Sequence, residues 1–85
     1  MQHLTPQDYS RRLGLVIKQA RLNHANPSLR TQAEFSERVG INRVYLAGLE
    51  TGRRMPGLQI LVAISQTIGI SMSELFASAE ELNIA

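Results

Sequence analysis

Apolar residues recur at every third or fourth position along most of this chain, and polar residues fill the positions between them. Such a period is typical of helices that bury one face. The first of these segments begins at Thr5-Pro6-Gln7-Asp8, where Thr is a good N-cap, Pro suits the first helical position and Asp completes a capping box. These signals predict a first helix over residues 6–23.

Turn-forming residues divide the rest of the chain into four shorter helices. The segment 23–28 reads as a loop, because Pro27 disfavours helix at the residue before it. Thr31 caps the next helix, and Glu34 completes a second capping box. Glycine ends this helix and the fourth one. The five predicted helices cover about 6–23, 31–40, 43–50, 58–68 and 72–83. The chain is therefore expected to be all-α.

Gly48 stands out within the short helix predicted over 43–50. Glycine in a helix interior costs about 1 kcal/mol relative to Ala, so a reason other than helix stability should favour it. Close approach of a binding partner is one explanation, and close packing against another helix is the other.

Length and composition indicate one small domain over residues 1–85. The absence of cysteine excludes disulfides and thiolate metal ligands, and fits a reducing cytoplasm. His3 and His24 have no metal-ligand spacing and are expected to be solvated. We recognise no signal peptide or membrane span. No metal, cofactor, membrane or small-molecule ligand is therefore expected.

Charge is divided unevenly along the chain. All nine Lys and Arg residues lie within residues 1–54, where the net charge is +5, whereas residues 55–85 contain three Glu, no cation and a net charge of −3. The first part should favour a polyanion and the second should repel one.

Residues 31–56, TQAEFSERVGINRVYLAGLETGRRMP, resemble the helix-turn-helix of the lambda repressor and Cro-like family, also called the XRE family. The matching positions are Thr31-Gln32, Gly40, Leu46, Leu49, Glu50, Gly52 and Pro56. The resemblance extends over roughly residues 13–76 and implies a five-helix lambda-repressor-like DNA-binding domain, with the helix-turn-helix at about 31–50. There are two departures: Ser36 replaces a small Ala, and the connection before Thr31 is about four residues longer than usual. Arg30 in that connection is either an added phosphate contact or a solvated residue.

The resemblance implies contacts with double-stranded DNA around a recognition helix over 43–50 in the major groove. The expected base contacts are Arg43, Val44 and Gly48, with a solvated Arg43 and a half-buried Val44 as the alternatives. Arg43 suits a guanine and Val44 a thymine methyl group. The expected phosphate contacts are Thr31, Gln32, Asn42, Tyr45, Thr51, Arg53 and Arg54. Of the last two residues Arg53 is the stronger candidate, and a solvated Arg54 is the alternative.

Glu50 at the end of that helix would be repelled by DNA if it faced the duplex. In the family the matching acid pairs with an Arg of the first helix, which here is Arg21. The resemblance therefore implies a partly buried, structural bridge between Arg21 and Glu50.

Apolar residues on the last helix are expected to form a self-complementary dimer patch. Its members are Met72, Leu75, Phe76 and Ala79. Such a homodimer would present two recognition helices to the half-sites of a pseudo-palindromic operator. Alternatively, these residues only complete the core of the monomer.

The resulting functional hypothesis is a sequence-specific transcriptional regulator. The motif resembles the small autoregulatory controller proteins of restriction-modification systems, with a phage-type repressor or an antitoxin-like regulator as alternatives. A protein-interaction module that kept the fold and lost DNA binding is a further alternative. No enzyme is expected, because no catalytic motif is recognisable.

Overall fold

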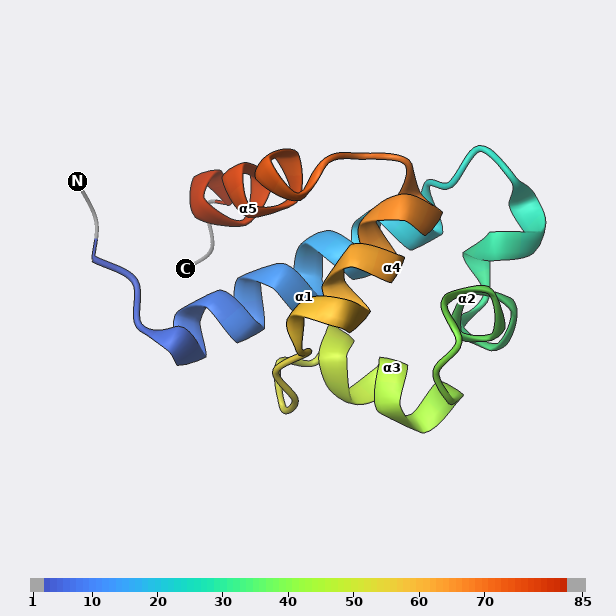
Figure 1. Cartoon of the computed structure of the whole chain (residues 1–85), viewed down its shortest axis with the longest axis horizontal. Helices are drawn as coiled ribbons and strands as arrows, with labels where there is room; N and C mark the ends of the chain where they lie inside the picture. The colour runs from blue at the N-terminus through green and yellow to red at the C-terminus, as the bar shows by residue number, and fades with distance from the viewer. Residues whose placement is uncertain (1–2, 83–85) are drawn as a thin grey trace.

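The computed structural model of the chain describes residues 3–82, which form α-helices and one short 3-10 helix (Figure 1). In chain order these are α1 (Pro6–Leu22), η1 (Pro27–Arg30), α2 (Gln32–Val39), α3 (Arg43–Glu50), α4 (Leu58–Ile68) and α5 (Met72–Glu81). The all-α prediction with five helices is confirmed, and residues 3–82 contain no strand. The last helix ends at Glu81 rather than at the predicted residue 83, which lies outside the described residues.

Hydrogen bonds in the first turns explain where the helices begin. The Thr5 hydroxyl accepts from the Asp8 amide at 3.1 Å, and the Asp8 carboxylate accepts from the Thr5 amide at 2.9 Å. The bonds from Thr5 hold the pKa of Asp8 below its usual value, because they stabilise the charged carboxylate. Ser71 and Glu74 form the same box at α5, whereas at α2 only the bond to the Thr31 hydroxyl forms.

The core forms where α1 passes between α3 and α5, which lie on opposite sides of it in Figure 1. Each of the five α-helices contributes to it. The large side chains that are less than 2% exposed are Leu13, Ile17, Phe35, Leu46, Leu49, Ile64 and Leu75. They occupy inner positions that the helical period predicts.

The inner face of α5 belongs to this core, contrary to part of the predicted dimer patch. Leu75 and Ala79 are both 0% exposed, while Met72 and Phe76 are half-buried at its edge. The prediction is therefore wrong for Leu75 and Ala79. A helix that closes a small core buries its apolar stripe within its own chain.

Arg12 fastens the C-terminal end of α5 to α1, a role that the sequence pattern did not indicate. Its side chain is buried, and Nη1 donates to the backbone oxygens of Ala79 at 3.2 Å and Leu82 at 2.6 Å. A cation here also stabilises the partial negative charge at a helix C-terminus. Close by, the Tyr9 hydroxyl donates to the Glu80 carboxylate, and this bond raises the pKa of Tyr9.

The connection between α1 and α2 folds into η1, where the sequence predicted a loop. Asn26 accepts from the Ser28 amide at 3.1 Å, and Leu29 is buried in the core. His24, predicted to be solvated, is half-buried: its Nε2 lies 2.9 Å from the Thr67 backbone oxygen, and its Nδ1 accepts from the Asn26 amide. That prediction is wrong because the segment packs against the end of α4.

Within residues 3–82, no single helix is long and apolar enough to cross a membrane. Taken together, α4 and α5 have the length and composition of a membrane span, but the pair is bent by 92°. Both also contribute side chains to the buried core, such as Ile64 and Leu75.

Candidate nucleic-acid interface

A tight turn at Gly40 joins α2 and α3 into a helix-turn-helix corner (Figure 1). The amides of Gly40 and Ile41 both donate to the Ser36 backbone oxygen, at 2.9 and 3.0 Å. Gly40 has φ +93°, and no atom lies within 4 Å of the position that a Cβ would take. The backbone conformation, rather than space, therefore favours glycine there. The Ser36 hydroxyl donates to the Ala33 backbone oxygen at 3.0 Å. The serine that replaces the family's usual alanine is therefore accommodated within α2.

The first residues of α3 face solvent. Asn42 caps the helix by accepting from the Tyr45 amide at 2.7 Å. Arg43 is exposed and Val44 is 69% exposed, whereas Leu46 is fully buried in the core. The helix therefore presents a polar and a small apolar side chain together at its exposed N-terminal end.

The expected bridge between Arg21 and Glu50 is confirmed. Nε and Nη2 of Arg21 donate to the two carboxylate oxygens of Glu50 at 2.7 and 3.0 Å, and the side chains are only 6% and 2% exposed. Arg21 Nη1 also donates to the Arg30 backbone oxygen. The Arg21 side chain thus links α1 and η1 to the end of α3.

Gln32, predicted to contact phosphate, belongs to the same cluster. Its Nε2 donates to Glu50 at 3.0 Å, so only one of its two amide hydrogens stays available to a ligand. The Arg30 side chain is likewise held by the protein, since its Nε donates to the His24 backbone oxygen at 2.8 Å.

Gly14 sets the distance between α1 and α3, and sequence reasoning missed it. A Cβ at this position would lie 2.2 Å from the Leu49 backbone oxygen and 3.0 Å from that of Glu50. The two backbones therefore approach each other more closely than any side chain allows. The signal in the sequence was only a glycine inside a helical pattern, with nothing to show what it touches.

Gly48 is buried, so the prediction of an exposed position facing bases is wrong. The Arg54 side chain covers it: a Cβ on Gly48 would lie 2.8 Å from Arg54 Cγ. Gly48 therefore packs closely against a side chain from the segment after α3. The alternative expected from the sequence was close packing against another helix.

The segment after α3 brings cations beside the helix end. Arg53 and Arg54 are exposed, and Arg53 Nε donates to the Thr51 hydroxyl at 3.3 Å. Arg11 of α1, which the sequence analysis did not single out, lines a polar hollow of about 470 Å³ together with Thr51 and Arg53. Asp8 lines it too and lies 4.0 Å from Arg11, so cations from two elements meet there beside one acid.

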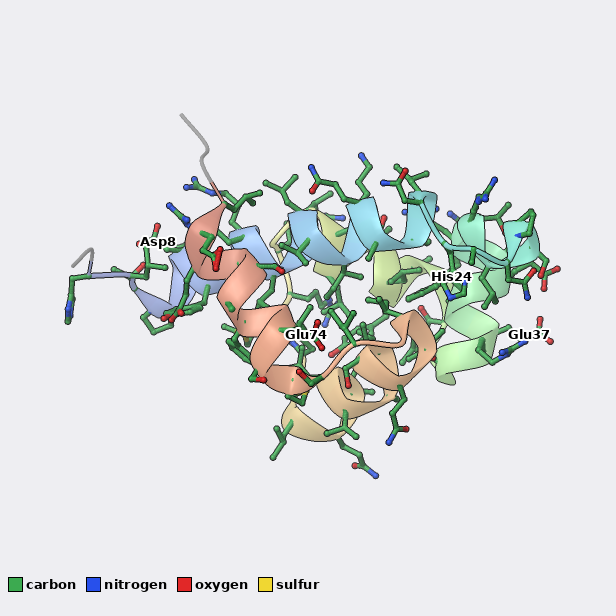
Figure 2. All side chains as sticks on the ribbon, turned by 90° about the horizontal axis from the view of Figure 1, so that it is seen from above. Asp8, His24, Glu37 and Glu74 are labelled. Atoms are coloured by element: carbon green, nitrogen blue, oxygen red, sulfur yellow. The ribbon has the colours of Figure 1, made fainter. Side chains whose placement is uncertain are left out.

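Acidic side chains are dispersed over the molecule. Figure 2 shows Asp8, Glu37 and Glu74 on three different helices, well apart from one another. Within residues 3–82, no group of three His, Asp or Glu side chains could hold a metal ion.

Comparison with known proteins gives consistent findings. Residues 17–75 match the family described as helix-turn-helix. Over 74 residues the chain is 32% identical to the control protein C.MunI of Mycoplasma sp., covering 87% of this chain and 96% of that protein. Over 51 residues it is 39% identical to an uncharacterised HTH-type transcriptional regulator, y4dJ, of Sinorhizobium fredii (strain NBRC 101917 / NGR234), covering 60% of this chain and 66% of that one.

A solved structure has the same fold. The clp gene regulator ClgR from C. glutamicum matches 93% of this chain and 92% of its own, with a TM-score of 0.74 and 20% identity. At that identity the likeness is one of helix arrangement.

Proposed function

Because this chain belongs to the XRE-type helix-turn-helix family, that of lambda repressor and Cro, we propose that it binds one specific duplex DNA sequence as a dimer. As a member it is a DNA-binding transcription regulator. The observation that carries the proposal is the exposed start of α3, where Arg43 and Val44 face solvent while Leu46 and Leu49 anchor the helix in the core.

Arg43 and Val44 are the proposed base contacts. In helix-turn-helix proteins the N-terminal residues of the second helix meet the base edges in the major groove. The guanidinium of Arg43 suits the O6 and N7 atoms of a guanine, and Val44 suits the methyl group of a thymine. We assign no base contact to Gly48, because Arg54 covers it.

Phosphate contacts are proposed for the residues that flank α3. They fix the position of the protein without reading sequence. The exposed amides at the start of α2 suit a phosphate, and Gln32 adds its second amide hydrogen. Arg11 joins the set, because it lines the same hollow as Arg53. The proposed phosphate contacts are Thr31, Gln32, Asn42, Tyr45, Thr51, Arg53, Arg54 and Arg11.

The proposed dimer uses the apolar surface that the monomer leaves uncovered. Leu58 is 72% exposed, and Val62 lies one helical turn further along α4. Met55 and Phe76 line an apolar groove of about 440 Å³, to which Leu61 of α4 also contributes. A two-fold axis through this surface lets the same patch of each copy meet the other. Two recognition helices roughly 34 Å apart would then read a pseudo-palindromic operator.

A controller protein of a restriction-modification system is the subgroup that we propose. The likeness to the control protein C.MunI, which extends over 87% of this chain, supports it. Autoregulation would then follow from an operator in the promoter of the chain's own gene.

Selection of bound duplexes from a randomised DNA pool tests the proposal. Wild type is expected to select a palindrome with one symmetric pair of guanines. Arg43→Ala should relax the preference at that pair, at a loss of roughly 1 to 3 kcal/mol per contact. Lys18→Ala is the control: it removes an exposed cation of α1 and should leave the selected sequence unchanged.

Two results would contradict the proposal. Weak binding without sequence preference in the wild type would favour the protein-interaction alternative. An unchanged guanine preference in Arg43→Ala would assign base reading to another side chain.

A further inference from the structure

Gly48 lies beneath the side chain of Arg54, and we infer that its role is to seat that side chain for contact with a DNA phosphate. The inference rests on the proposed function, because it explains how one of the proposed phosphate contacts is positioned. Gly48 would then be a positioning residue that acts through Arg54.

The backbone brings Arg54 back over α3. The Gly48 carbonyl oxygen accepts from the amides of Arg53 at 3.0 Å and Arg54 at 3.2 Å. It also accepts from the Thr51 hydroxyl at 3.2 Å. These bonds turn the chain sharply after the helix, so that the first atoms of the Arg54 side chain lie beside Gly48.

The stem of Arg54 then occupies the space that a side chain at position 48 would need. The three atoms nearest to a Cβ built on Gly48 all belong to Arg54: Cγ at 2.8 Å, and Cβ and Cδ at 3.7 Å each. A separation of 2.8 Å is too short for two carbon atoms, so an alanine at position 48 would displace the arginine stem.

Beyond the stem, the guanidinium rests on an aromatic ring. Its central carbon lies 5.7 Å from the centroid of the Tyr45 ring, a position in which the ring attracts the cation. The ion pairs found within residues 3–82 join Arg11 to Asp8 and Arg21 to Glu50, so Arg54 takes part in neither. A guanidinium held over a ring in this way keeps its N–H groups free, and these suit a phosphate. The side chain is thus held in place by contacts that leave its donors available.

The competing explanation is that a bare helix face at Gly48 lets α3 approach the bases. In that case the loss caused by a side chain at position 48 would not depend on Arg54. If Gly48 seats Arg54, the two positions must be coupled, and removing the Arg54 side chain must abolish the effect of changing Gly48.

A double-mutant cycle measures that coupling. Wild type, Gly48→Ala, Arg54→Ala and the double variant are titrated against the wild-type selected duplex over a series of salt concentrations. Thermal unfolding is followed for all four proteins, so that a loss of folding is distinguished from a loss of binding. Lys18→Ala, which also removes one exposed cation, is the charge-matched control.

We expect Arg54→Ala to weaken binding about tenfold for each charged hydrogen bond lost, hence about a hundredfold for the two protomers of the proposed dimer. Its salt dependence should fall by about one unit of slope per lost phosphate contact, hence by about two for the dimer. Gly48→Ala should show the same two changes, and the double variant should bind no more weakly than Arg54→Ala. Without the arginine stem, alanine at position 48 should raise the unfolding temperature, since the nearest remaining Arg54 atom, Cβ, lies at 3.7 Å.

Three outcomes would overturn the inference and leave the proposed function standing. These are an equal loss from Gly48→Ala with and without the Arg54 side chain, wild-type binding by Gly48→Ala, and wild-type binding by Arg54→Ala. A wild-type protein that selects no duplex would instead overturn the proposed function.

Discussion

The carboxylate of Glu50 receives hydrogen bonds from Arg21 of α1 and Gln32 of α2. Both of its oxygens are therefore paired, and the pair lies almost entirely out of water. A buried charge is tolerated only when its partners replace the water that it has lost. The acid at the end of α3 thus serves the fold, and the Arg21 charge beside it is neutralised.

Glu50→Ala is expected to lower the free energy of unfolding by about 3 to 5 kcal/mol, because Arg21 would stay buried without its carboxylate partner. Denaturant unfolding followed by circular dichroism measures the change. Glu37→Ala is the control, since Glu37 is an exposed acid of α2. A similar small change in both variants would show that the bridge contributes little to stability.

The contact between α1 and α3 depends on a position without a side chain. Gly14 lets the Leu49 and Glu50 carbonyl groups lie against α1, and this contact fixes the position of α3. Close backbone packing of this kind has no substitute, because a methyl group would force the helices apart.

Gly14→Ala should destabilise the chain by at least about 1 to 3 kcal/mol, the usual effect of overpacking a core. It should also weaken DNA binding, because α3 would shift relative to α1. Thermal unfolding and duplex titration measure the two effects.

The control is Gly57→Ala, since no atom lies within 4 Å of a Cβ at that position. An unaltered unfolding temperature in Gly14→Ala would show that the two helices separate without loss.

The distance along the chain between contacting residues explains what the sequence could predict. Helix starts and stops were predictable because their signals are local: Thr5 bonds with Asp8 three residues on, and Gly40 ends the helix that it follows. The roles of Gly14 and Arg12 were not, because their partners lie 35 residues or more away in the chain. The Arg21–Glu50 bridge came from the family resemblance rather than from any pattern in the chain itself.

In the candidate site the sequence predicted which residues lie near α3 better than what they do. Arg43 and Val44 are exposed as expected. Gly48 was misjudged, because the direction of the Arg54 side chain depends on the turn after the helix. No periodicity in the sequence encodes that direction.

Cations are distributed unevenly over the whole molecule. All of them lie in residues 1–54, together with four acids, whereas α5 carries three acids and no cation. In Figure 1, α5 lies on the side of α1 opposite to α3. A polyanion is therefore drawn to the α3 side. The uncovered apolar residues of α4 and its neighbours form the surface proposed for the dimer.

Leu58→Glu is expected to shift the proposed dimer to monomer, because it would place two like charges in an apolar interface. It should leave the fold intact, since Leu58 is 72% exposed in the monomer. Sedimentation equilibrium measures the change in mass. Leu22→Glu is the matched control, because Leu22 is a leucine of α1 that is 49% exposed. A Leu58→Glu protein that remains dimeric would place the interface elsewhere.

Within α3, the side chains that stabilise the fold differ from the proposed base contacts. Leu46, Leu49 and Glu50 hold the helix, whereas the exposed Arg43 and Val44 lie outside the core. Substitutions at those two positions are therefore nearly free of structural penalty. After a gene duplication, two copies of such a protein would acquire different target sites while both stay folded. The buried bridge at Glu50 thus leaves the DNA specificity of the chain free to diverge.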